Sequence, residues 1–150
     1  MSGLGGSATG EIDAPIERVW ATLTEIETIP EWQKGITNVE ALERDADGQV
    51  ALANVTADAK VKELTVKTRF TRQAPTRLSW KVEAGDVKTL DGQWTLEDLG
   101  DGRTRATYEI EVDPGRMLRM LVRGAVEDAV RERLVTHRPA ELAARVAARG

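Results

Sequence analysis

Hydrophobic positions near the start of the chain recur with the spacing of an α-helix. Four of them lie three or four residues apart and so share one helical face: Ile16, Val19, Trp20 and Leu23. A second short helix is predicted over residues 29–34, with Pro30 near its start and Gly35 at its end. Residues 8–13, ahead of both helices, favour a first strand.

From residue 36 onward the hydrophobic period changes to two, which is the period of a β-strand. We expect strands over residues 36–44, 49–56 and 61–72, followed by three more that end near Asp113. Along the last four of these strands one parity carries the apolar and small side chains: Leu64, Val66, Thr68, Phe70, Leu78, Trp80, Val82, Leu90, Gly92, Trp94, Leu96, Thr104, Ala106, Tyr108, Ile110 and Val112. This alternation predicts an antiparallel sheet with one dry face and one face in water.

The last quarter of the chain returns to a helical pattern. A helix is predicted from about residue 115 to residue 137, and Pro139 is expected to kink or break it. Residues 139–150 then form a short helical extension. The predicted apolar stripe of the long helix consists of Leu118, Leu121, Val122, Ala125, Val126 and Ala129.

These elements together predict an α+β fold in which a curved antiparallel sheet of about seven strands wraps around the long C-terminal helix. The two short helices follow the first strand, and the long helix is the element large enough to cover the dry face. Bulky side chains either fill the space between sheet and helix or leave an internal cavity. We expect a flexible N-terminus over residues 1–7, one domain over residues 8–138 and the extension over residues 139–150.

Composition excludes several kinds of chemistry. The 150 residues include no cysteine and a single histidine, so disulfides, thiolate zinc sites and multi-histidine metal sites are excluded, and no metal or cofactor is expected. No apolar run approaches the roughly 20 residues of a membrane span, and the first residues lack the features of a secretory signal. We therefore expect a cytoplasmic protein without stable membrane insertion. His137 follows the end of the predicted helix, so we expect a surface position for it.

Charge is distributed unevenly along the chain. Residues 1–113 carry 13 basic and 21 acidic side chains, whereas residues 114–150 carry 8 arginines and 4 acidic side chains. The arginines are interpreted as the solvated face of a helix, with a surface for anionic lipid or another partner as the alternative. Four acidic residues interrupt them and no aromatic residue lies among them, so no binding of nucleic acid is expected.

Three sequence blocks resemble one family. They are Ile12-Asp13-Ala14-Pro15-Ile16-Glu17-Arg18-Val19-Trp20, then Ile29-Pro30-Glu31-Trp32, then Asp91-Gly92-Gln93-Trp94-Thr95-Leu96 with Gly102-Arg103-Thr104-Arg105-Ala106-Thr107-Tyr108-Glu109. In order and spacing they are similar to the helix-grip START-like superfamily of polyketide cyclases, aromatase/cyclases, coenzyme Q-binding START-like proteins and birch-pollen-type allergens. The resemblance covers about residues 8–137 and implies the helix-grip fold. Ile29 departs from it, since members often carry an aromatic residue at that position.

A candidate ligand site follows from the dry face of the sheet. Its members are Leu64, Val66, Thr68, Phe70, Trp80, Trp94 and Tyr108, and the four rings among them either fill the interior or line a pocket for a flat apolar ligand. The resemblance implies that Trp32 lies near the cavity entrance, with packing of the short helix as the alternative. Met117 and Leu121 are candidates for the far wall, and Met120 for a contact in a homodimer.

Three functions remain open. The first is binding or transport of a small hydrophobic molecule such as a lipid, a quinone or a polyketide-like aromatic. The second, implied by the resemblance, is a polyketide cyclase or dehydratase, for which Tyr108 is the catalytic candidate because Arg69, Arg103 and Arg105 have the outward parity. The third is an interaction protein that uses the arginine-rich C-terminal segment. A cavity of roughly 300 Å³ or more favours a ligand, whereas tight ring packing favours the interaction protein.

Overall fold

Seven antiparallel strands form a single sheet in the order β1-β7-β6-β5-β4-β3-β2. The computed structural model describes residues 5–60, 62–121 and 123–149, so the predicted strand start at Val61 and the predicted stripe position Val122 lie outside the described residues. The strands are β1 (Gly6–Ile12), β2 (Ile36–Arg44), β3 (Val50–Asp58), β4 (Glu63–Gln73), β5 (Arg77–Gly85), β6 (Thr89–Gly100) and β7 (Arg103–Asp113). The predicted α+β helix-grip architecture is confirmed.

The register of the sheet brings the aromatic residues together. Phe70 of β4 pairs with Trp80 of β5, and Trp94 of β6 pairs with Tyr108 of β7. Trp80 in turn pairs with Gly92, a position without a side chain. Because directly opposite residues project from the same face of an antiparallel pair, all four rings lie on the dry face.

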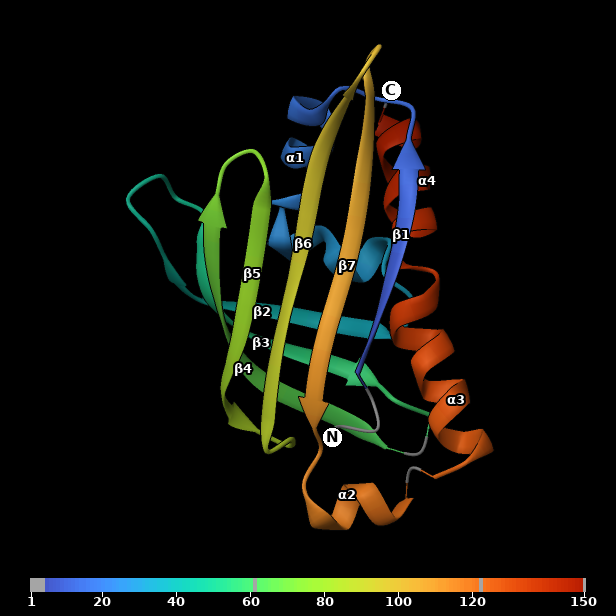
Figure 1. The fold of residues 1–150 in the computed structure, drawn as a ribbon. Coiled ribbons are helices and arrows are strands. Elements are labelled where there is room, and N and C mark those ends of the chain that lie inside the picture. The colour runs from blue at the N-terminus through green and yellow to red at the C-terminus, as the bar shows by residue number, and fades with distance from the viewer. Residues whose placement is uncertain (1–4, 61, 122, 150) are drawn as a thin grey trace.

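The sheet is strongly curved. Figure 1 shows β2 and β3 running across the direction of β6 and β7 rather than alongside them. The register shifts within the β2–β3 pair and between Lys67 and Thr68 of the β4–β5 pair. Such irregularities bend a strand and increase its twist, which lets one sheet form a concave wall.

Two short helices connect β1 to β2. The first, α1 (Ile16–Leu23), buries Ile16, Val19 and Leu23, as its spacing predicts. The second is a 3-10 helix, η1 (Ile26–Glu31), rather than a helix over residues 29–34, and Pro30 stands near its end instead of its start. Because Pro30 has no backbone N–H, it cannot donate a hydrogen bond within the helix. This favours a short 3-10 segment over a longer α-helix.

The C-terminal helical segment is displaced along the chain from its predicted position. A separate short helix, α2 (Arg116–Leu121), is followed by α3 (Ala125–Arg131), a π-helical turn η2 (Glu132–Thr136) and α4 (Arg138–Arg149). The single helix predicted over residues 115–137 is therefore wrong. Gly124, with φ +57° and ψ −124°, lies outside the helical region of backbone space and separates α2 from α3. The long helical segment that packs on the sheet begins at Ala125.

The predicted apolar stripe is correspondingly shifted. Leu118 is buried, but Leu121 and Val126 are exposed, and the buried positions of this segment are Val130 and Val135. The expected interruption near Pro139 is present, because the π-helical turn and the non-helical His137 precede α4. Pro139 itself lies in the first turn of α4, where its missing N–H leaves no bond unmade.

The helix α4 is part of the core. Leu142 and Val146 are 0% and 1% exposed and belong to the same cluster as Val19, Leu23 and Trp94. Figure 1 shows α4 beside β1 at one end of the molecule and α2 beyond the far end of β7. A second cluster, with Leu64, Val112, Leu118 and Val130, forms the core toward α2.

Candidate functional site

A cavity of about 130 Å³ lies between the concave face of the sheet and the helices that cover it. Six of the predicted ligand residues line it: Val66, Thr68, Phe70, Trp80, Trp94 and Tyr108. Other lining residues come from the covering elements and the neighbouring strands: Leu23, Ile29, Gln33, Ile36, Val55, Ala57, Leu78, Leu90, Ile110, Leu134 and Arg138. The cavity thus joins the middle of the sheet to α1, η1, η2 and α4.

The remaining predicted site residues lie elsewhere. Leu64 lines a second cavity of about 90 Å³, toward α3. Trp32 packs against the core without lining the first cavity, and its indole Nε1 is buried without a hydrogen-bond partner. The packing alternative for Trp32 therefore agrees better with its position than a place at the entrance.

The placement of Met117 and Leu121 in the far wall is wrong. Their exposed fractions are 83% and 55%, and α2 carries both of them away from the cavity. The cause is the break at Gly124, because a continuous helix is required to bring residues 117 and 121 over the sheet. Leu134 and Arg138, which follow the break, form that wall instead.

The rings on the dry face fill part of the interior and leave the cavity beside them. The Tyr108 ring lies 5.0 Å from the Trp94 ring in an edge arrangement and 5.6 Å from the Trp80 ring in a tilted one. A Cβ atom at Gly92 would overlap the Trp80 indole. Glycine at this position therefore allows the indole to lie over β6, where a side chain would displace it.

Arg138 is a buried, cavity-lining residue that sequence analysis missed. It is 2% exposed, and it is the one charged side chain in the buried class among the described residues. Its Nη1 donates to the Lys34 carbonyl and to the Glu141 carboxylate, each at 2.8 Å. The signal was available, since positions 138, 142 and 146 follow a spacing of four and place Arg138 on the buried stripe of α4.

Tyr108 and Arg138 form a polar end of the cavity. The Arg138 guanidinium lies 5.9 Å from the centre of the Tyr108 ring, within the range of a cation–π contact. Burial raises the pKa of the Tyr108 hydroxyl, and the Arg138 cation offsets part of this rise. The hydroxyl is therefore protonated at neutral pH and is able to donate a hydrogen bond.

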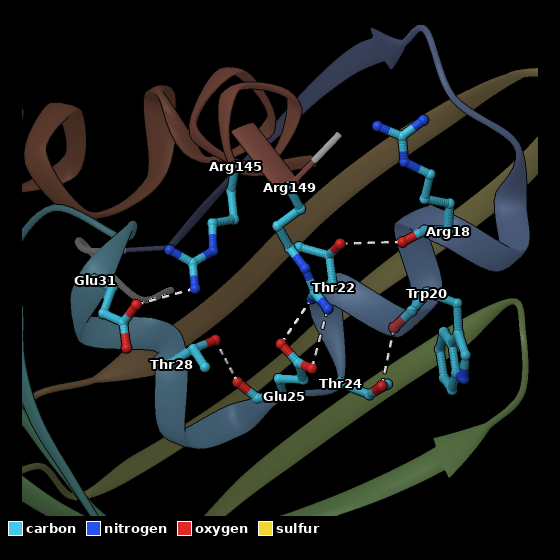
Figure 2. Close-up of polar contacts among 9 residues, drawn as sticks. All are labelled: Arg18, Trp20, Thr22, Thr24, Glu25, Thr28, Glu31, Arg145 and Arg149. Atoms are coloured by element: carbon cyan, nitrogen blue, oxygen red, sulfur yellow. Dashed lines mark hydrogen bonds and ion pairs between the residues drawn. The ribbon is translucent and has the colours of Figure 1, made fainter. Parts of the chain in front are cut away.

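Ion pairs fasten α4 to the segment around η1 and so hold it over the cavity. Arg145 pairs with Glu31 at 3.0 Å and Arg149 pairs with Glu25 at 2.7 Å; the dashed lines in Figure 2 mark both ion pairs. From α1, Arg18 donates to the Val146 carbonyl of α4 at 3.1 Å. Glu31 and Glu25 both belong to the acidic part of the chain, residues 1–113. The uneven charge distribution therefore helps to hold α4 against the rest of the fold.

Other titratable groups stand apart from the cavity. His137 is exposed and lies 3.5 Å from Glu132, which confirms its predicted surface position. Within residues 5–60, 62–121 and 123–149 no cluster of three or more histidine, cysteine or acidic side chains is arranged to hold a metal ion. In the same residues, no helix combines the length and hydropathy needed to cross a membrane.

Comparison with known proteins agrees with this architecture. The family described as "Polyketide cyclase / dehydrase and lipid transport" matches residues 12–137. A search of curated proteins finds no match. Among solved structures, a START superfamily protein from Mycobacterium smegmatis has a TM-score of 0.82 at 18% identity and covers 97% of this chain and 99% of that one.

Two further structures show the same fold. A protein from Thermus thermophilus gives a TM-score of 0.77 at 21% identity, over 97% of this chain and 99% of that one. The Zhui aromatase/cyclase from a Streptomyces species gives 0.70 at 18% identity, over 97% and 92%. Since the family match spans most of the sequence, the chain belongs to the polyketide cyclase/dehydrase and lipid transport family.

Proposed function

We propose that this chain binds a small apolar molecule in the cavity between the sheet and α4. The observation that carries the proposal is a cavity lined mainly by aliphatic and aromatic side chains, with Gln33, Thr68, Tyr108 and Arg138 as its polar groups. Ligand sites combine an apolar lining with a few polar groups that fix orientation. The family, whose description includes lipid transport, supports the same class of function.

The size of the cavity limits the ligand. At about 130 Å³ it is smaller than the roughly 300 Å³ expected for a pocket that takes drug-sized molecules. It approaches the volume of an engineered apolar cavity of about 150 Å³ that binds benzene. A one-ring molecule is therefore the ligand that this conformation accommodates.

A larger ligand, such as a lipid, a quinone or a polyketide-like aromatic, requires the two cavities to join. They share the lining residues Ala57, Val66, Leu90, Ile110 and Leu134, so these side chains separate them. Ligands of both sizes belong in the experimental test.

The test is thermal unfolding and tryptophan fluorescence with a panel of one-ring, multi-ring and acyl-chain compounds. A ligand at a hundredfold excess over its Kd stabilises the folded state by about 2.7 kcal/mol. We expect Ala57→Leu, which adds volume to the shared wall, to weaken binding, and Ala144→Leu, on the exposed side of α4, to leave it unchanged. The absence of any shift across the panel would overturn the proposal.

A second candidate, cyclase-type catalysis, is favoured by the pairing of Tyr108 with Arg138. A protonated phenol beside a guanidinium can donate to a carbonyl oxygen and stabilise negative charge that develops on it. Tyr108→Phe then abolishes turnover of a poly-β-ketone substrate while the unfolding midpoint stays close to that of the wild type. Equal turnover by the two proteins would exclude Tyr108 from catalysis. For either function the cytoplasm is the proposed location.

A further inference from the structure

The hydrogen-bonding capacity of Arg138 is only partly used by the protein. An arginine side chain has five N–H donors in a fixed plane. Its bonds to the Lys34 carbonyl and to Glu141 both originate from Nη1, and its Nε is buried without a partner. Arg138 lines the cavity, and no hydrogen bond within the described residues uses its Nη2, so the Nη2 N–H groups are the donors to which a ligand atom can bind.

A second polar side chain on the same wall is also unfilled. Gln33 is 7% exposed and lines the cavity, and within the described residues its side-chain amide takes part in no hydrogen bond. Gln33 precedes Lys34, whose carbonyl accepts from Arg138. The sheet side of the cavity is mostly apolar, with Thr68 and Tyr108 as its polar side chains, and further donors lie where the chain passes from η1 to β2.

The charge of Arg138 is already balanced. Glu141 accepts from Arg138 through Oε1 at 2.8 Å and from the Lys34 amide through Oε2 at 3.0 Å. The carboxylate is therefore held in place by both oxygens, and its side chain is only 16% exposed. A ligand that reaches the guanidinium meets a neutral ion pair with spare donors, not an uncompensated positive charge.

This balance determines which ligand oxygen the site accepts. A carboxylate would lose its hydration and bring a second negative charge close to Glu141, without a second cation to compensate. A neutral acceptor, such as a carbonyl oxygen, takes the free donors without adding charge. We propose that the Arg138–Glu141 pair is the polar anchor of the cavity and selects uncharged oxygen acceptors over carboxylates; this rests on the proposed binding of apolar molecules.

The experiment uses three one-ring probes of similar size: toluene, acetophenone and benzoate. Isothermal titration of the wild-type chain is expected to show acetophenone binding about tenfold more tightly than toluene, because a hydrogen bond to a charged donor forms. Benzoate is expected to bind at least about tenfold more weakly than acetophenone. Arg138→Met removes the guanidinium donors, so this variant is expected to bind acetophenone and toluene with equal affinity.

Glu141→Gln tests the charge balance without removing Arg138. It leaves the guanidinium uncompensated, so benzoate is expected to gain about tenfold in affinity while toluene is unchanged. The matched control is Glu31→Gln, which removes a negative charge paired with Arg145 on the same helix but away from Arg138. This variant is expected to leave all three affinities unchanged. If Arg138→Met does not fold, the benzoate affinities of Glu141→Gln and the wild type still test whether the Arg138–Glu141 pair selects against carboxylates.

The outcomes separate the anchor from the general function. Equal binding of toluene and acetophenone to the wild type overturns the anchor and leaves the apolar site standing. Benzoate binding as tightly as acetophenone, or an unchanged benzoate affinity in Glu141→Gln, overturns the selectivity. Failure of all three probes to bind overturns the anchor, whereas the proposed binding function is overturned only if the multi-ring and acyl-chain compounds of the larger panel also fail to bind.

Discussion

The two ends of the C-terminal helical segment, α2 and α4, have similar composition and opposite environments. The helix α2 carries two arginines beside leucine and methionine, and α4 carries three arginines beside leucine, valine and alanine. In α4 the apolar residues Leu142 and Val146 are buried. In α2 Met117, Met120 and Leu121 are 83%, 62% and 55% exposed, and only Leu118 is buried.

Their arginines differ in the same way. Arg145 and Arg149 of α4 pair with acidic residues more than 100 positions earlier in the chain, whereas Arg119 of α2 pairs with Asp113, six positions away. An amphipathic stripe thus specifies which face of a helix is apolar. That face is buried only where another part of the fold packs against it. For α4, the sheet and α1 provide that surface.

The largest effect distinguishing the two helices is expected from truncation of their leucines. Leu142→Ala leaves a cavity in the core and is expected to reduce the free energy of unfolding by about 2–5 kcal/mol. Leu121→Ala, the matched change in α2, is expected to change it by less than about 0.5 kcal/mol. Urea unfolding of both variants measures the difference, and equal losses would show that α2 is packed in solution.

A smaller effect is expected from the ion pairs that fasten α4. Arg149→Gln removes the bond to Glu25, in which the two side chains are 37% and 45% exposed, so a loss of about 0.2–1 kcal/mol is expected. A double-mutant cycle with Glu25→Gln isolates the pair, and repeating the measurement in high salt should reduce the coupling. A coupling energy of zero at low salt would show that the ion pair between Arg149 and Glu25 does not help to hold α4 in place.

The smallest effect concerns Asp113, the last residue of β7, which lies shortly before α2. The Gly115 amide donates to its carboxylate at 3.0 Å, and this bond together with the nearby Arg119 and Lys88 lowers the pKa of Asp113. Because the folded-state pKa is lowered, the stabilisation is complete above the ordinary value of about 3.9 and is lost as the pH falls through the folded pKa.

Carboxyl-carbon NMR titration measures this shift directly. Arg119→Gln should bring the midpoint only part of the way back, since the amide bond from Gly115 remains. A midpoint at the ordinary value in the wild-type chain would mean that the start of α2 is not held as described.

The sequence predicted the sheet well and the helices less well, for physical reasons. Alternation along β4 to β7 is a local pattern that directly reports which face is dry, so Thr68, Phe70, Trp94 and Tyr108 were placed correctly. A helix boundary depends on single residues such as Gly124, whose backbone conformation the hydrophobic pattern does not report. Met117 and Leu121 were misplaced for that reason.

Arg138 was overlooked for a different reason. An arginine near a proline and a helix end is usually solvated, and its burial depends on partners distant in the chain, here the Lys34 carbonyl and the Tyr108 ring. The nearby Glu141, three positions on, is the local part of the arrangement. The polar end of the site therefore became visible only in the folded chain.

Gly92 has a consequence for how this protein can change over evolution. The Trp80 indole occupies the space in which a side chain at position 92 would stand, so the cavity volume depends on an atom that is missing from β6. A single substitution to alanine would force the indole away from the strand and change the shape of the cavity, although Gly92 does not itself line it. Substitution at Gly92 can therefore change which ligands fit the cavity, although glycine itself contributes no side chain there.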